Sequence, residues 1–258
     1  MLRSLKEVRG YRILAVDGPI GNVHDFFFDD TSWIVRYIIV DTGAWLPGRK
    51  VLLVPSAVEQ PSWETRTLPV KMTKDQIKQS PDIDADKSVS RYHEIELHKY
   101  YNWVPYWSLP HQGIAPGIPP VARLVPIAGT VKPGKPPEGA AAADEEKVDP
   151  HLRSVKEVTG YHIQAADGGI GHVEEFIADD DNWVIRYMVI DTKNWLPGQK
   201  VLVPPSWIVS VSWEEAKVFI NLPRETIKNS PEFNPGDPVN RQYEEKLYDY
   251  YGRPKYWT

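Results

Sequence analysis

The chain has 258 residues, a net charge of −5 and 41% hydrophobic residues, and it contains no cysteine. This apolar content excludes a disordered protein, since disordered chains lack the surface needed to build a core. The missing cysteines exclude disulfides, thiolate metal sites and cysteine nucleophiles.

The N-terminal residues lack the apolar stretch of a signal peptide, and no segment reaches the roughly 18–20 apolar residues of a membrane helix. We therefore expect a cytoplasmic protein without a membrane span and leave peripheral membrane association open. Nucleic-acid binding is not expected, because the chain is acidic and has no basic stripe with interleaved aromatic residues.

The chain repeats itself after 150 residues, without a gap. Trp33 falls on Trp183, Asp41-Thr42 on Asp191-Thr192, and Tyr106-Trp107 on Tyr256-Trp257. This period is too long for a solenoid and predicts two copies of one domain, at residues 1–107 and 151–258. Residues 108–150 are rich in Pro, Gly and Ala and are predicted to form a linker. We expect the copies to pair about a pseudo-twofold axis.

The first half of each copy predicts β-structure. In the first copy, short β-branched and aromatic runs are separated by turn signals such as Asp17-Gly18 and Asp29-Asp30. The expected strands are Tyr11–Val16, Val23–Phe28, Trp33–Val40 and Lys50–Val54. They predict a small barrel or a tightly curled sheet with helix over one face.

The second half of each copy predicts two helices. Thr73-Lys74-Asp75-Gln76 has the spacing of a capping box, and Pro223 suits a first helical position. A longer amphipathic helix follows, with Leu97, Tyr100 and Tyr101 on one face in the first copy and Leu247, Tyr250 and Tyr251 in the second. Gly252 is a natural stop for the second of these helices.

The first copy resembles the PRC-barrel family. The similarity rests on Gly18–Gly21, on Trp33, Arg36-Tyr37 and Asp41-Thr42, and on the run Trp45–Leu52, and it extends to the second copy and to the Tyr-Tyr elements after each barrel. The family includes the cytoplasmic domain of the photosynthetic reaction centre H subunit and a domain of a ribosome maturation factor. The resemblance implies two tandem β-barrels with appended helices, a mainly β fold that docks on a larger assembly. The H subunit's membrane span and the maturation factor's additional N-terminal domain are not expected here.

Four strand residues could carry a ligand or serve the fold. Arg36 and Arg186 interrupt apolar strands, and a buried Arg needs a partner such as Asp41 or a bound carboxylate. Asp41 and Asp191 at strand ends more often bond backbone amides in a turn. We expect structural roles for these residues and leave a ligand pair open.

No metal site is expected. His24, His93 and His98 have Glu174, Tyr243 and Tyr248 as counterparts, so the copies share no histidine site. Glu174-Glu175 and Asp179–Asp181 form an acidic rim that we interpret as a solvated loop rather than a weak cation site.

The tryptophans allow two interpretations. Trp33, Trp45 and Trp63 with Trp183, Trp195 and Trp213 either fill the barrels or form a stacking platform, and we favour the core. Trp107, Trp257, Tyr101 and Tyr251, near the helix ends, are the candidates for contact with a partner, because Trp and Tyr are favoured in interface hot spots.

No catalytic motif, cofactor motif or phosphate-binding glycine loop is found. We therefore predict a non-catalytic adaptor with a protein partner and no cofactor. The alternative is a small-molecule, redox-cofactor or ion-binding protein at a membrane electron-transfer complex, which rests only on the similarity to the H subunit.

Overall fold

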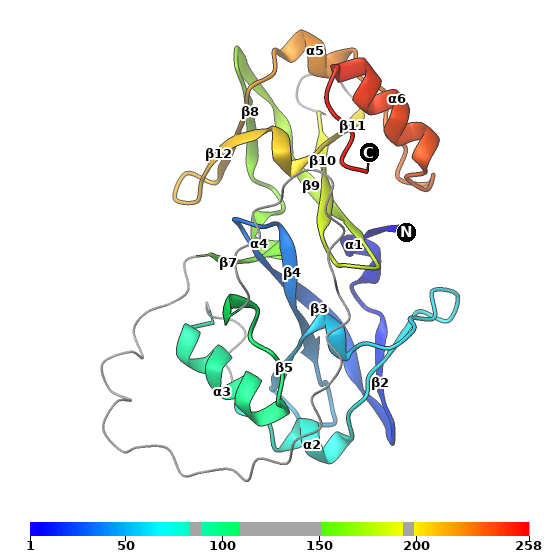
Figure 1. The fold of residues 1–258 in the computed structure, drawn as a ribbon, viewed down its shortest axis with the longest axis vertical. Coiled ribbons are helices and arrows are strands. Elements are labelled where there is room, and N and C mark those ends of the chain that lie inside the picture. Colours follow the sequence, from blue (N-terminus) through cyan, green and yellow to red (C-terminus); the bar gives the residue numbers. More distant parts are fainter. Residues whose placement is uncertain (83–88, 109–150, 193–198, 258) are drawn as a thin grey trace.

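The computed structural model describes residues 1–82, 89–108, 151–192 and 199–257. Most of the predicted linker and the segment around Trp195 therefore lie outside the described residues. The fold is mainly β with appended helices, as predicted, and contains two twisted sheets, one for each copy (Figure 1). Within the described residues each sheet follows an open path, and the strand pairings do not close it into a barrel.

In its described residues, the first copy contains six strands and three α-helices. The strands are β1 (Leu2–Ser4), β2 (Arg12–Ala15), β3 (Gly18–Asp29), β4 (Ile34–Asp41), β5 (Lys50–Leu53) and β6 (Thr67–Pro69), and the helices are α1 (Leu5–Val8), α2 (Lys74–Lys78) and α3 (Arg91–Tyr101). The sheet order is β5-β4-β3-β2-β6, antiparallel except for β2 and β6.

The second copy repeats this order and adds one strand. Its strands are β7 (Leu152–Ser154), β8 (His162–Ala165), β9 (Gly168–Asp179), β10 (Ile185–Asp191), β11 (Lys200–Val203), β12 (Ile208–Ser212) and β13 (Lys217–Ile220), and its helices are α4 (Val155–Val158), α5 (Arg224–Lys228) and α6 (Arg241–Tyr251). The sheet order is β11-β10-β9-β8-β13-β12, with β8 and β13 parallel.

The long strand of each copy depends on one glycine. Gly21 has a φ of +153°, and a Cβ built there would lie 2.0 Å from the Asp41 carbonyl oxygen on β4; Gly171 meets Asp191 in the same way at 1.9 Å. No side chain fits between strands that close. The glycine therefore lets β3 pair with both β2 and β4 although the chain bends there.

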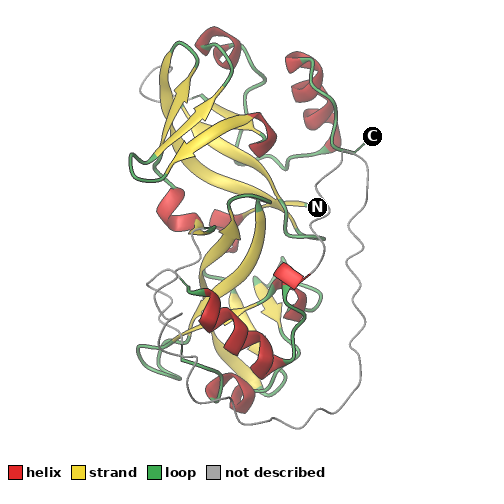
Figure 2. Ribbon diagram, turned by 60° about the vertical axis from the view of Figure 1, so that its left-hand side comes forward, coloured by secondary structure: helices red, strands yellow, loops and turns green. Residues whose placement is uncertain are grey.

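The two copies exchange their first strands. β1 pairs antiparallel with β9 of the second copy, and β7 pairs antiparallel with β3 of the first. The N-terminus accordingly lies beside the second sheet, at the junction of the copies (Figure 2). An isolated antiparallel bridge between Ile34, at the start of β4, and Val184, just before β10, adds a further backbone contact between the copies.

Aromatic side chains pack across this junction. The ring of Phe28 lies 5.7 Å from that of Phe176, Trp33 lies 6.4 Å from Phe176, and Phe26 lies 6.2 Å from Trp183. Phe26, Phe28 and Phe176 are fully buried. The hydrophobic core is therefore continuous between the copies, and burial of these rings stabilises the pair.

The helix ends follow the sequence closely. The capping box at Thr73 and Gln76 is present, and Gly252 ends α6 in the left-handed conformation, as Asn102 ends α3. Pro223 is the N-cap of α5 rather than its first residue, because the first helical residue is Arg224.

The predicted buried face of each terminal helix is confirmed at Leu97 and Leu247 but not at the first tyrosine of each Tyr-Tyr pair. Tyr100 and Tyr250 are 40% exposed, and their hydroxyls donate to the carbonyls of Gln76 and Thr226. The fully buried helix positions include instead a carboxylate, Glu94 in α3 and Glu244 in α6.

Candidate functional site

A buried carboxylate fixes the terminal helix of the first copy to its sheet. Glu94 Oε1 accepts hydrogen bonds from the hydroxyls of Tyr37 on β4, at 2.7 Å, and of Tyr106, at 2.9 Å. Arg91 Nη1 lies 2.9 Å from Glu94 Oε2. Burial and the nearby Glu94 charge raise the pKa of Tyr37. These bonds satisfy a charge that would otherwise be costly to bury.

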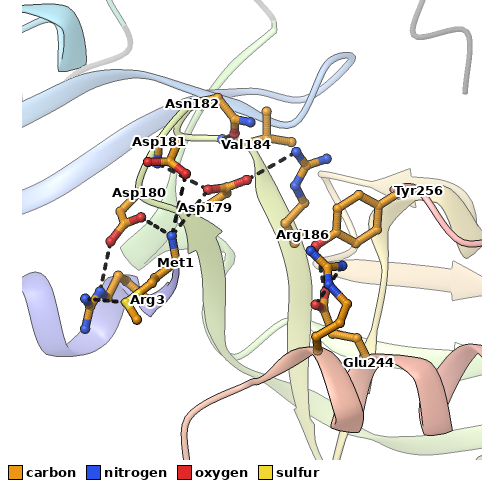
Figure 3. A network of polar contacts seen from close by, with 11 residues as sticks. Met1, Arg3, Asp179, Asp180, Asp181, Asn182, Val184, Arg186, Glu244 and Tyr256 are labelled. Atoms are coloured by element: carbon orange, nitrogen blue, oxygen red, sulfur yellow. Dashed lines mark hydrogen bonds and ion pairs between the residues drawn. The ribbon is translucent and has the colours of Figure 1, made fainter. Parts of the chain in front are cut away.

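The second copy contains the same network. The hydroxyls of Tyr187 and Tyr256 each lie 2.7 Å from Glu244 Oε1, and Arg241 Nη1 lies 3.0 Å from Oε2. Figure 3 shows Tyr256 beside this carboxylate, whereas the Arg186 guanidinium extends to Asp179 and lies 4.4 Å from the Tyr256 ring. The network is therefore a repeated structural element that holds the C-terminal Tyr-Trp segment of each copy.

The two networks differ at one position. His98 of α3 is buried and its Nε2 lies 2.9 Å from the Tyr37 hydroxyl, whereas the counterpart in α6 is Tyr248. Burial lowers the pKa of His98 to about 4, and the charge of Arg91 acts in the same direction. His98 is thus neutral at pH 7, where it contacts the Tyr37 hydroxyl and packs on the Trp107 ring.

The tryptophans predicted to contact a partner are held within the chain. Trp107 is half-buried, 4.8 Å from the His98 ring and under the Arg91 guanidinium at 4.3 Å. Trp257 lies 5.1 Å from Tyr248 and 4.1 Å from the Arg241 guanidinium.

The two predicted tyrosines are held in the same way. Tyr101 stacks on Trp103 at 4.3 Å, and Tyr251 packs on Trp207 at 4.5 Å. Burial raises the pKa of both hydroxyls to about 12. The four candidate contact residues therefore pack within their own copies, and their contact with a partner stays a prediction.

Arg36 and Asp41 do not form the expected pair. Arg36 Nη2 lies 3.6 Å from Asp29 on β3, and the guanidinium covers the Tyr106 ring at 4.2 Å. Asp41 is exposed and accepts a hydrogen bond from the Gly43 amide at 2.8 Å, within the turn. The partner of Arg36 is therefore Asp29 on the neighbouring strand β3, not Asp41 on its own strand.

The second copy repeats this arrangement. Arg186 Nη2 lies 3.4 Å from Asp179, not beside Asp191. Asp191 lies opposite His172 in the register of β9 and β10.

The interpretation of Asp179–Asp181 as a solvated loop fits Asp181, which is 87% exposed, but not Asp179 and Asp180, which are 18% and 12% exposed. The N-terminal ammonium of Met1 bonds to Asp180 and lies 3.9 Å and 3.8 Å from Asp179 and Asp181, and Arg3 Nε lies 3.0 Å from Asp180 (Figure 3). The acidic turn therefore binds the exchanged N-terminal strand. In the first copy, the Asp30 carboxylate occupies the corresponding place. Arg153 Nε lies 3.2 Å from its Oδ2, and His151 Nδ1 lies 3.0 Å from its Oδ1.

Glu174 and Glu175 also serve this junction. Glu175 is buried and accepts a hydrogen bond from Ser4, and its pKa is raised by burial. Glu174 forms ion pairs with Lys6 of the other copy and with Lys200, both at 2.9 Å. Desolvation opposes the effect of the two ammonium groups, but they lower the pKa of Glu174 to about 2.

One possible metal-ligand group was not predicted from the sequence. The strand register brings donor atoms of His172, Glu174 and Asp191 within 4.8 Å of one another. The ammonium groups of Lys6 and Lys200 already balance the negative charge of the Glu174 carboxylate. A cation would compete with both lysines, so the group is a poor metal site.

The tryptophans of the proposed platform lie in several places. Trp33 and Trp183 are at the junction of the copies, Trp63 lies 4.3 Å below the Arg3 guanidinium, and Trp213 lies 4.2 Å below that of Arg153. Trp45 lies 5.0 Å from Lys74 Nζ. They form no common stacking surface among the described residues, and only Trp183 of those described is buried in the core.

The second copy presents an edge strand that the first copy lacks. β12 pairs only with β13 among the described strands, and Val209 on it is 65% exposed. The counterpart of Val209 is Glu59, and that of Val211 is Pro61. Pro has no N–H for a ladder, and a charge on an edge discourages pairing. Residues 208–212 therefore form an uncharged strand with one register shift between Ile208 and Ser210, whereas residues 58–62 form only isolated bridges.

None of the helices in the described part of the chain is both long and apolar enough to cross a membrane. No protein-family model matches the chain, and no curated protein matches it. The similarity to PRC barrels therefore rests on the residues given above and stays a prediction.

Proposed function

We propose that the chain is a non-catalytic interaction module, in which two paired copies of one domain present β12 to an extended segment of a partner protein. The observation that carries this proposal is the exposed, uncharged edge of the second sheet at β12. Such an edge offers backbone groups to a further strand, and its side chains select the sequence that binds.

The difference between the copies supports this surface. The first copy has Glu59 and Pro61 where the second has Val209 and Val211. The β12–β13 hairpin projects from the side of the second copy (Figure 1), where a partner strand can approach it.

The absence of a catalytic role is supported by the contacts of the polar residues. Glu94, Glu244 and Arg36 are engaged in networks that hold helices and tails on the sheets. The acidic residues of the second copy hold the exchanged strand. Similarity to PRC barrels, which dock on larger assemblies, favours the same function.

The test uses the intact chain and the variant Val209→Glu/Val211→Pro, which installs the residues of the first copy. The intact chain is expected to capture a partner in stoichiometric amount, with slowed amide hydrogen exchange at residues 208–212. The variant should lose the partner while its circular dichroism is unchanged. Val16→Ser, which alters an exposed apolar residue of the first copy, is the matched control and should retain the partner.

Retention of the partner by the double variant, or protection from exchange at another surface only, would contradict the proposal.

A further inference from the structure

The outer face of the second copy contains a hollow of about 360 Å³. Its polar lining comes from His162 and Gln164 of β8, Lys217 of β13 and Arg224 of α5. Its apolar lining includes Ile163 and Ile170, both almost completely buried. The volume is at the lower end of small-ligand sites, which are about 300–1,000 Å³.

The strand register brings the polar groups together. His162 and Gln164 are two residues apart on β8 and so share one face. Lys217 lies beside His162 in the parallel pairing of β8 and β13. Gln164 lies opposite Gly169 on β9, where no side chain fills the space.

Arg224 reaches the hollow from the end of the sheet. Its Nη1 lies 3.2 Å from the position that a Cβ on Gly168 would occupy, so the guanidinium lies against the backbone of the β8–β9 turn. The lining therefore combines Arg and Lys with an amide and a His, and it contains no carboxylate.

Two acidic residues lie close by. Glu215 forms an ion pair with Lys217 at 3.1 Å, but both side chains are well exposed and such surface pairs are weak. Asp167 accepts a hydrogen bond from the Arg224 backbone amide at 2.8 Å, at the start of α5. These carboxylates border the hollow without lining it.

The corresponding positions of the first copy have a different chemistry. Leu14 replaces Gln164, Thr67 replaces Lys217 and Pro19 replaces Gly169. Lys74 replaces Arg224 and is directed to the Trp45 ring, 5.0 Å away. Arg12 replaces His162, so the first copy keeps positive charge here but lacks the counterparts of Lys217 and Gln164.

We propose that this hollow binds a small phosphate monoester. Arg224 and Lys217 hold the phosphate, since the guanidinium fork matches two phosphate oxygens and the ammonium supplies a point charge. The organic part of the ligand lies over the peptide backbone at Ile163 and Ile170, whose side chains are buried away from the hollow. This site is separate from the β12 edge, because the hollow is lined by no residue of that strand.

The test titrates the full chain with phenyl phosphate, inorganic phosphate and benzoate, and follows backbone amide NMR shifts. We expect saturable shifts at Gln164, Lys217 and Arg224, with phenyl phosphate binding at least threefold more tightly than inorganic phosphate and tenfold more tightly than benzoate. Lys217→Thr combined with Arg224→Ala should weaken phenyl phosphate binding at least tenfold. Lys74→Ala, at the matching position of the first copy, should leave it unchanged.

Lys217→Thr alone installs the residue of the first copy and should fold normally, with at least threefold weaker binding. Shifts that do not saturate, equal affinity in the double variant, or equal binding of benzoate would overturn the proposal.

Discussion

Arg153 of the second copy lies 3.2 Å from Asp30 of the first, and the pair has its counterpart in Arg3 and Asp180. Each Arg follows the start of an exchanged strand and covers a Trp of its own copy, Trp213 for Arg153 and Trp63 for Arg3. The same residues therefore link the copies in both directions, as expected of a covalent substitute for a symmetric dimer.

The buried carboxylate of α6 should be important for stability. Glu244→Leu removes the acceptor of Tyr187 and Tyr256 and leaves their hydroxyls buried, and it should lower the free energy of unfolding by about 3 kcal/mol. Urea denaturation measures this change. Glu245→Leu, at the exposed neighbouring position, is the control and should change stability by less than about 0.5 kcal/mol. Equal effects of both substitutions would mean that the network does not hold the helix.

The close approach of the Gly21 and Asp41 backbones predicts a large loss of stability when Gly21 is substituted. In Gly21→Ala the new Cβ would overlap the Asp41 carbonyl, so β3 and β4 must separate, at a cost of about 3 kcal/mol or more. Gly10→Ala is the matched control, because Gly10 also has a positive φ, +85°, but no atom lies within 4 Å of its Cβ position. It should cost only about 1 kcal/mol. Thermal melting of both variants distinguishes the steric effect from the effect of φ.

His98 should make the stability of the first copy depend on pH. Its folded pKa of about 4 lies below the unfolded value near 6.5, so the unfolded chain binds more protons between these values. Stability is fully present above pH 6.5 and should fall by up to about 3 kcal/mol as the pH is lowered to about 4.

The substitution His98→Gln tests this dependence, because Gln does not titrate. Urea denaturation at several pH values should show a smaller slope between pH 4 and 6.5 in this variant than in the unaltered chain. His162→Gln changes an exposed His and should leave the slope as it was. An unchanged slope in His98→Gln would show that other groups cause the acid sensitivity.

Much of the fold follows from local sequence signals. The apolar run before Asp41 predicts β4, and Thr73 with Gln76 predicts the start of α2, because strand burial and helix capping depend on near neighbours. β1 and β7 were not predicted, since three-residue strands are stabilised by pairing with the other copy. β12 was also missed, although the change from Pro61 to Val211 was a usable signal.

The polar contacts depend on the tertiary fold and were harder to predict. A Glu in an amphipathic helix is usually exposed to solvent. Nothing near Glu94 or Glu244 in the sequence shows that a strand Tyr covers it in the fold. The recurrence of Arg three residues before each Glu was the available signal. The residues predicted to contact a partner were chosen because Trp and Tyr are favoured in interfaces, and their contact with a partner stays a prediction.

The central claim is that exchanged strands, and not the linker, hold the two copies together. The direct measurement introduces a protease site between residues 130 and 140, cleaves the folded chain and determines the mass of the product by light scattering in dilute, non-denaturing buffer. The two fragments are predicted to stay together with the mass of the intact 29.5 kDa chain. Separation into fragments of about half that mass would contradict the claim.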